Sequence, residues 1–192
     1  MKKFIYLFLF LTLPFIANSQ ANSFANDYSK GDLTIIGQYV VIDVENLTVD
    51  ETYKKVINWI KRTYSEPNKN IKATIDNEYI KITANGIVAS WKEEKEIASK
   101  VFKDKTSKSI KIKTVDANYT LTFEFKPNKV KVQIINMIRT TESGTILDFS
   151  KWVGSRAPND LYREACKIIP ETMNILVKNL ETFLNSKQTT EW

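Results

Sequence analysis

The chain has 192 residues, of which 43% are hydrophobic, which is enough to fill the core of one domain. Only 5 Gly and 5 Pro are present, which excludes a low-complexity or disordered protein. Lys and Arg (28) outnumber Asp and Glu (22), but Arg, the residue that most often reads bases and phosphates, occurs only at positions 62, 139, 156 and 163, so we expect no nucleic-acid binding.

Residues 1–19 have the pattern of a secretory signal peptide. A short basic start precedes an apolar run over residues 4–16, and the small residues that follow favour a cut between Ser19 and Gln20. The apolar run is too short for a spanning helix. We therefore expect an exported protein, periplasmic or secreted, with no transmembrane segment in the mature chain. An uncleaved anchor is the alternative.

Cysteine occurs once, at Cys166, so no internal disulfide can form. An exported protein without disulfides suits a bacterial periplasm better than a small animal secreted domain. The helical pattern around Cys166 indicates a small buried apolar residue, with a reactive thiol as the alternative.

The mature chain divides into three parts. Residues 20–37 are polar and predict a flexible N-terminal segment, residues 38–185 predict a single α+β domain, and residues 186–192 form a polar C-terminal tail. The apolar run within residues 38–45 predicts the first strand.

A helix is expected to begin at Thr48, because Thr48 and Glu51 have the spacing of a capping box. Trp59 lies off the centre of the apolar stripe of this helix, which indicates packing at its edge, with a ligand wall as the alternative. Pro67 and Asn68 are expected to end the segment. The stripe itself contains Val49, Tyr53, Val56, Ile57, Ile60 and Tyr64.

Short strands are expected over residues 71–76, 78–84 and 87–91, with tight turns at Asp76-Asn77 and Asn85-Gly86. This is a meander of three strands. Residues 92–113 are rich in Lys, with interspersed acids. They predict a solvated connection with a short helical piece; a basic flap for an acidic partner or anionic lipid is the alternative.

Residues 119–138 predict the hairpin at the centre of the domain, turning at Pro127-Asn128. Apolar residues alternate on both strands, which fixes the register. The expected apolar pairs are Phe125 with Val130, Phe123 with Val132 and Leu121 with Ile134. Tyr119 should meet Asn136, and on the other face Glu124 should meet Lys131 and Thr122 should meet Gln133.

Residues 139–158 contain several helix breakers, and residues 159–185 have the apolar spacing of a long final helix. Asn159 should cap this helix, and Pro170 should kink it or split it in two. The whole pattern predicts an α+β fold: a curved antiparallel sheet of about five or six strands, with the capped helix and the C-terminal helix packed on one face.

The helix entry over residues 46–53, Trp59 and the strand over residues 119–126 resemble the DUF4468 family, exported proteins of Bacteroidetes-type bacteria. The resemblance covers roughly residues 38–138. This chain departs from the family pattern in its Pro127-Asn128 turn and in having Asn46 where Gly is favoured. The resemblance implies a TBP-like, helix-grip-like fold and brings no catalytic residues. A fold shared with a DNA-bending protein does not transfer DNA binding.

Histidine is absent, which removes His-dependent triads, the usual zinc sites and the commonest general base. No Gly-rich phosphate loop occurs. The neighbouring acids Asp50 and Glu51 are explained by helix capping, and those at residues 93–96 lie in a charged segment. We therefore expect no enzyme, no cofactor and no metal site, with an enzyme of unfamiliar chemistry as the last alternative.

The leading hypothesis is a non-catalytic exported binding module for a small hydrophobic ligand or a protein partner in the cell envelope. The other hypothesis is an envelope scaffold that acts through a sheet edge or the Lys-rich segment. If a concave apolar site exists, the expected lining comes from the hairpin, with Trp152 at the mouth; the alternative is that all of these side chains are core. The candidate residues are Tyr119, Leu121, Phe123, Phe125 and Trp152.

Overall fold

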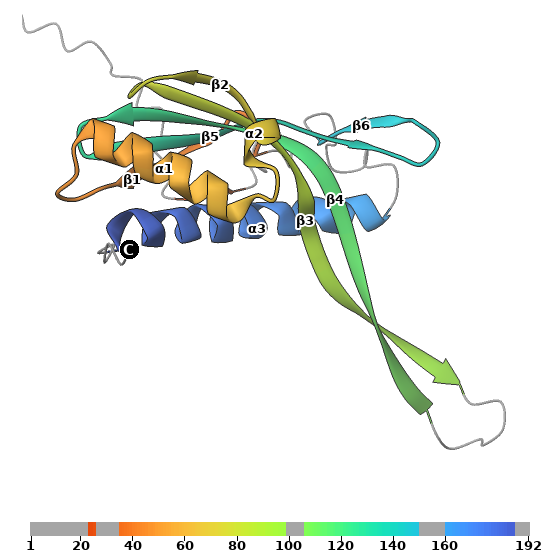
Figure 1. The fold of residues 1–192 in the computed structure, drawn as a ribbon. Coiled ribbons are helices and arrows are strands. Elements are labelled where there is room, and N and C mark those ends of the chain that lie inside the picture. The colour runs from red at the N-terminus through yellow and green to blue at the C-terminus, as the bar shows by residue number, and fades with distance from the viewer. Residues whose placement is uncertain (1–22, 26–34, 99–105, 150–159, 187–192) are drawn as a thin grey trace, which may run out of the picture.

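The computed structural model describes residues 23–25, 35–98, 106–149 and 160–186 (Figure 1). The expected leader, Trp152, Asn159 and nearly all of the C-terminal tail lie outside these residues. Within the described ranges none of the helices is long and apolar enough to cross a membrane. The elements are β1 (Tyr39–Asp43), α1 (Val49–Thr63), α2 (Pro67–Asn70), β2 (Ile71–Ile75), β3 (Tyr79–Ala98), β4 (Thr106–Lys126), β5 (Lys129–Thr140), β6 (Ile146–Asp148) and α3 (Asp160–Asn185).

The strands form one open antiparallel sheet in the order β1-β5-β4-β3-β2, and β6 pairs with β5. Both long helices, α1 and α3, cover the same face (Figure 1). The other face of the central strands carries polar side chains, among them the hydrogen-bonded hydroxyls of Thr83 and Thr120, 3.0 Å apart. This arrangement confirms the α+β prediction of a sheet with its helices on one side.

The central hairpin, formed by β4 and β5, turns at Pro127-Asn128 as predicted, and Asn128 has a positive φ of 62°. The pairs from Phe125 with Val130 to Leu121 with Ile134 are also confirmed. The prediction for Tyr119 was wrong, because an extra residue in β5 shifts the register beyond Leu121. Tyr119 therefore pairs with Met137, which is buried, instead of Asn136.

The predicted turn at Asn85-Gly86 and the strand break that it implied were wrong. Both residues lie inside β3, paired with Asn118 and Ala117 of β4. The positive φ angles of described non-glycine residues occur at Asn46, Asn77 and Asn128, so the Asp76-Asn77 turn is confirmed. An Asn-Gly pair permits a tight turn, but continuous pairing with a long partner strand satisfies more backbone hydrogen bonds. The second and third strands of the predicted meander are therefore one strand, β3, which pairs with β2.

The solvated connection with a helical piece predicted for residues 92–113 was also wrong. β3 continues to Ala98 and β4 begins at Thr106, and the two pair along this whole length. They form a two-stranded arm that projects from the body of the molecule (Figure 1). Ile110 and Ile112 alternate with lysines in β4 and are exposed, which is a strand pattern that the charge of the segment obscured.

The entry of α1 confirms the capping box: Glu51 donates its backbone N–H to the Thr48 hydroxyl, and the Glu51 carboxylate accepts the Thr48 backbone N–H. Trp59 is buried and packs against the rings of Tyr64 and Phe123, so it belongs to the core and makes more than the edge contact predicted for it. α1 ends at Thr63, before Pro67 as predicted, and Pro67 begins the separate short helix α2.

The final helix α3 is one element of 26 residues that runs through Pro170, so the proline does not split it. Its inner side buries Ala165, Ile169, Met173, Leu180 and Leu184 against the sheet and α1. Cys166 is buried beside this row, and burial raises the pKa of its thiol to about 11. This confirms a small apolar core residue in place of a reactive thiol.

Candidate functional site

The predicted ligand-lining residues of β4 lie in one row that faces the helices, and all four are buried. The Phe123 ring lies 6.2 Å from that of Trp59, and the Phe125 ring lies 5.3 Å from that of Tyr53, each nearly edge-on. These contacts place the row in the packed layer between the sheet and α1. The row consists of Tyr119, Leu121, Phe123 and Phe125.

Of this row, Tyr119 also borders an open cleft, which we call the α3 cleft. The cleft has a volume of about 540 Å³ and lies between the end of α1, the middle of α3 and the sheet. Its lining residues are Trp59, Arg62, Thr63, Ile87, Tyr119, Thr172, Met173, Ile175, Leu176, Asn179 and Phe183.

The floor of the α3 cleft is buried, whereas two isoleucines on its border are exposed. Trp59, Tyr119 and Met173 are buried residues of the lining, while Ile87 is 59% exposed and Ile175 is 65% exposed. Exposed isoleucines around a hollow with a buried apolar floor leave apolar surface in water, which is the kind of surface that binding covers.

Two polar contacts hold the walls of the α3 cleft together. The Trp59 indole Nε1–H donates to Oδ1 of Asn179 at 2.9 Å and joins α1 to α3. The Tyr119 hydroxyl donates to the Tyr64 hydroxyl at 3.3 Å and joins the sheet to the end of α1. These groups already bind one another, so the floor presents mainly apolar surface to a ligand.

The tyrosines at this site stay neutral. Burial raises the pKa of the Tyr64 hydroxyl. Burial also raises the pKa of Tyr119, and by more than the hydrogen bond to Tyr64 lowers it. Neither hydroxyl can act as a base near neutral pH. Arg62 is the one charged residue of the lining; its guanidinium lies 5.3 Å from the centre of the Phe183 ring. It forms no ion pair with a described residue, so it can meet an anionic group at the mouth.

The position of α1 against α3 is fixed at a second place. Lys55 donates from Nζ to the backbone oxygens of Leu184 at 2.8 Å and of Ser186 at 3.1 Å, at the end of α3. A cation suits the exposed carbonyls of a helix C-terminus. Together with the Trp59–Asn179 bond, this contact sets the width of the α3 cleft.

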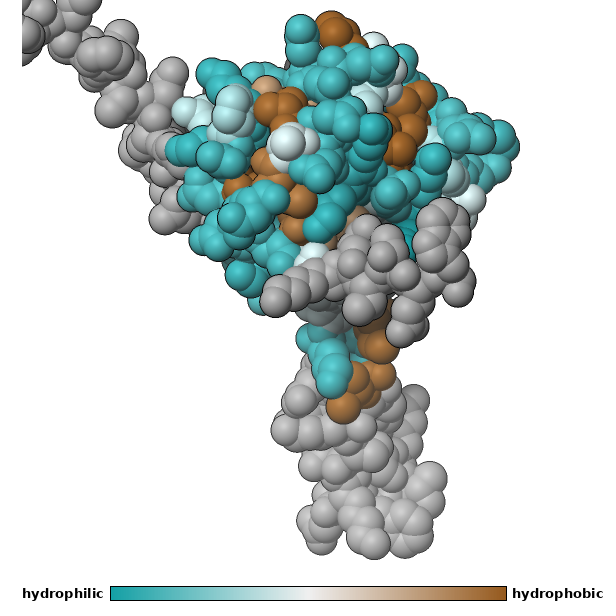
Figure 2. Space-filling view, turned by 60° about the vertical axis from the view of Figure 1, so that its left-hand side comes forward, coloured by the Kyte–Doolittle hydropathy of each residue, from teal (hydrophilic) through white to brown (hydrophobic). Residues whose placement is uncertain are grey.

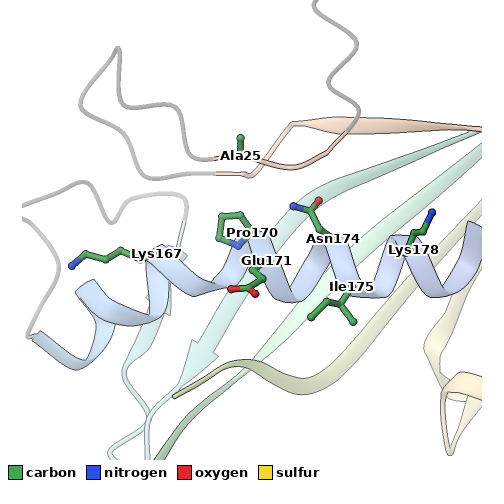
Figure 3. Close-up of a pocket in the computed structure, with 7 residues that line it drawn as sticks. All are labelled: Ala25, Lys167, Pro170, Glu171, Asn174, Ile175 and Lys178. Carbon is green, nitrogen blue, oxygen red and sulfur yellow. The ribbon is translucent and has the colours of Figure 1, made fainter. Parts of the chain in front are cut away.

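We call residues 23–25 the strap. A second hollow runs along α3 beside the strap (Figure 3). It has a volume of about 580 Å³ and is lined by Ala25 and by the α3 residues Lys167, Pro170, Glu171, Asn174, Ile175 and Lys178. Two of these, Lys167 and Lys178, bind Glu164 and Glu181 at 2.7 and 2.8 Å. Ile175 lines both hollows, so the helix presents it between them.

Sequence reasoning missed most of this site. Ile87 was assigned to a separate strand, and Ile175 falls outside the apolar stripe predicted for the final helix. An isoleucine off the stripe of an amphipathic helix was the available signal, because it predicts exposed apolar surface. Among the described residues, no group of three or more acidic or Cys side chains lies close enough to hold a metal ion.

Similar structures are known for this fold. A DUF4468 family protein from Bacteroides ovatus is similar with a TM-score of 0.51 and 12% identity, over 80% of this chain and 88% of that one. The chain has the fold of a DUF4468 family protein. This likeness confirms the fold that the resemblance implied. A TBP-like protein from Parabacteroides distasonis is similar with a TM-score of 0.49 and 12% identity, over 78% of this chain and 92% of that one.

No protein-family model matches the chain, and no curated protein matches it. The descriptions of the two similar structures state no catalytic activity. At 12% identity the likeness extends to the fold and not to the residues of the site.

Proposed function

We propose that this protein is an exported, non-catalytic binding module that takes an apolar group into the α3 cleft. The apolar group belongs to a small hydrophobic ligand or to a protein partner in the cell envelope. The observation that carries the proposal is the border of exposed Ile87 and Ile175 around a buried apolar floor. The polar groups of that floor are bonded to one another, which suits apolar binding better than chemistry.

A second function, an envelope scaffold that acts through a sheet edge, is favoured by the arm. β2 pairs with β3 only as far as Ile82, and β5 pairs with β4 only as far as Asn118. Beyond these residues, toward the tip of the arm, the outer edges of β3 and β4 have no strand beside them among the described residues. Figure 2 shows hydrophobic surface on the part of the arm nearest the body. Ile112 is 65% exposed there. Open edges with exposed isoleucines pair readily with another strand.

One experiment separates the two functions with three matched substitutions. Ile175 borders the cleft, Ile112 lies on the arm and Ile146 lies in β6; they are 65%, 65% and 66% exposed. Each is changed to Lys, so all three variants add the same charge at a similarly exposed site. The chains are exported by a bacterial host, purified from its envelope fraction and compared by native and denaturing mass spectrometry.

The binding-module proposal predicts extra mass on the wild-type chain that disappears on denaturation. The mass should be absent from Ile175→Lys and present on Ile146→Lys, because only the former puts an ammonium group into the apolar border. Loss of bound mass from Ile112→Lys alone would instead support the scaffold. Equal retention by Ile175→Lys and Ile146→Lys would contradict the role of the α3 cleft.

A further inference from the structure

The strap, residues 23–25, packs on the domain far from its place in the sequence. Phe24 is only 2% exposed and belongs to the core cluster, although Ser23 and Ala25 on either side of it are exposed. A single aromatic side chain is therefore inserted into the domain from a short peptide that otherwise lies on the surface.

The backbone of Phe24 is held by one side-chain amide of α3. Asn174 accepts the Phe24 backbone N–H on Oδ1 at 2.7 Å and donates from Nδ2 to the Phe24 carbonyl oxygen at 2.9 Å. Figure 3 shows Asn174 pointing from α3 toward the segment that carries Ala25. The preceding residue, Met173, is buried in the core, which fixes the helix under this contact.

The backbone of Ala25 is held in the same way from the start of β1. Gln38 accepts the Ala25 backbone N–H on Oε1 at 3.0 Å and donates from Nε2 to the Ala25 carbonyl oxygen at 2.5 Å. The backbone of Gln38 is paired with β5 through its carbonyl oxygen, which accepts the Ile134 N–H at 3.3 Å. Gln38 thus joins the strap to the sheet, with its side-chain amide on Ala25 and its backbone on β5.

These contacts have the form of a peptide-binding site. Side-chain amides that pair with both backbone groups of a residue bind any extended segment, and a buried socket selects one anchor side chain. No backbone–backbone hydrogen bond ties the strap to another described residue. The four hydrogen bonds between the strap and the rest of the described chain are made by the side chains of Asn174 and Gln38, so a segment from another chain could make the same ones.

We propose that the socket around Phe24 is a peptide-binding site, and that a second copy of the chain fills it by exchange of residues 23–25. Residues 26–34 connect Ala25 to Ile35, and such a link can span up to roughly 35 Å when extended. The strap can therefore reach a neighbouring copy. Mutual exchange repeats every contact of the monomer and closes a twofold dimer, which is why exchange of identical segments is a low-cost route to association.

The test uses chains that begin at Gln20, and two variants that each lose one half of the contact. Phe24→Ala keeps the socket and loses the anchor, whereas Asn174→Ala keeps the anchor and loses one clamp. Each variant and their equimolar mixture are examined by analytical ultracentrifugation and native mass spectrometry. Circular dichroism confirms that both are folded. Gln38→Ala replaces Asn174→Ala if that variant does not fold.

The proposal predicts a one-to-one complex in the mixture, in a larger amount than either variant forms alone. In addition, a peptide with the sequence of residues 20–26 should bind Phe24→Ala, and the same peptide with Ala in place of Phe should bind about 30-fold more weakly or worse. On the unchanged chain, excess peptide should shift the side-chain amide resonance of Asn174. The proposal is overturned if the mixture stays monomeric, or if the peptide shifts no Asn174 resonance.

Discussion

At the scale of single residues, two members of the buried row on β4 differ in whether they also border the cleft. Phe123 is wholly buried against Trp59, while Tyr119 is buried but borders the α3 cleft and binds Tyr64. Before the structure, both were equally good candidates for a ligand-lining surface, because strand alternation places them on the same face. The structure assigns them different roles, and substitutions can measure the difference.

Phe123→Ala should lower the free energy of unfolding by about 3–5 kcal/mol, because it leaves a cavity in the packed layer between β4 and α1. Tyr119→Phe keeps the ring and removes one hydroxyl contact, so it should cost only about 1 kcal/mol. Urea unfolding followed by circular dichroism measures both. A loss below about 1 kcal/mol for Phe123→Ala would mean that this side chain lines a pocket and not a packed core.

At the scale of elements, α1 was predictable to its first residue because its start is encoded locally. The capping box needs only Thr48 and Glu51, three residues apart. The Glu51 carboxylate accepts hydrogen bonds from the backbone N–H and from the hydroxyl of Thr48. Both lower the pKa of Glu51, the backbone bond more than the hydroxyl. A carboxylate near the positive end of a helix is also favoured in its charged form.

This lowered pKa gives a pH dependence with a definite sign. A carboxyl whose folded pKa lies below its unfolded value stabilises the fold above the unfolded pKa, and the contribution is lost as the pH falls through the folded pKa. Glu51→Gln should therefore destabilise the chain at neutral pH, and the difference from wild type should shrink below about pH 4.

Thermal unfolding between pH 7 and pH 3 measures this effect. Glu78→Gln, which removes an exposed carboxylate from a turn between two strands, serves as the control and should not reproduce the Glu51→Gln profile. A Glu51→Gln deficit that grows toward acidic pH would contradict the role given to the capping box.

The arm was unpredictable for the opposite reason, since its structure depends on pairing with a second strand and not on a local signal. Asn85-Gly86 and the Lys-rich segment each have a plausible local structure, a turn and a solvated helix. Both were overruled because β4 supplies one continuous partner for β3 from Tyr79 to Ala98. Pairing between two strands leaves little trace within either one, except here the alternation of Ile110 and Ile112 with lysines.

At the scale of the whole molecule, the sheet, both long helices and their common face could be predicted, because each has a clear apolar period. The α3 cleft could not be predicted, because it depends on the distance between α1 and α3. Side-chain contacts between the helices set that distance, above all Trp59 with Asn179 and Lys55 with the end of α3. An amphipathic pattern identifies the buried face of a helix and does not fix its spacing from a neighbour.

Two of the exposed isoleucines, Ile87 and Ile175, lie at the cleft beside α3. Ile175 lines the α3 cleft and the hollow beside the strap, so one exposed residue belongs to both.

The most direct test of the binding cleft is an NMR titration of the isotope-labelled chain with the apolar anion 8-anilinonaphthalene-1-sulfonate. The account predicts that the Trp59 indole N–H and the methyl groups of Ile87 and Ile175 shift together and saturate. The methyl groups of Ile146, which is equally exposed but distant in the fold, should stay unchanged. Shifts confined to Ile110 and Ile112, with the Trp59 signal unmoved, would contradict the account and assign apolar binding to the arm.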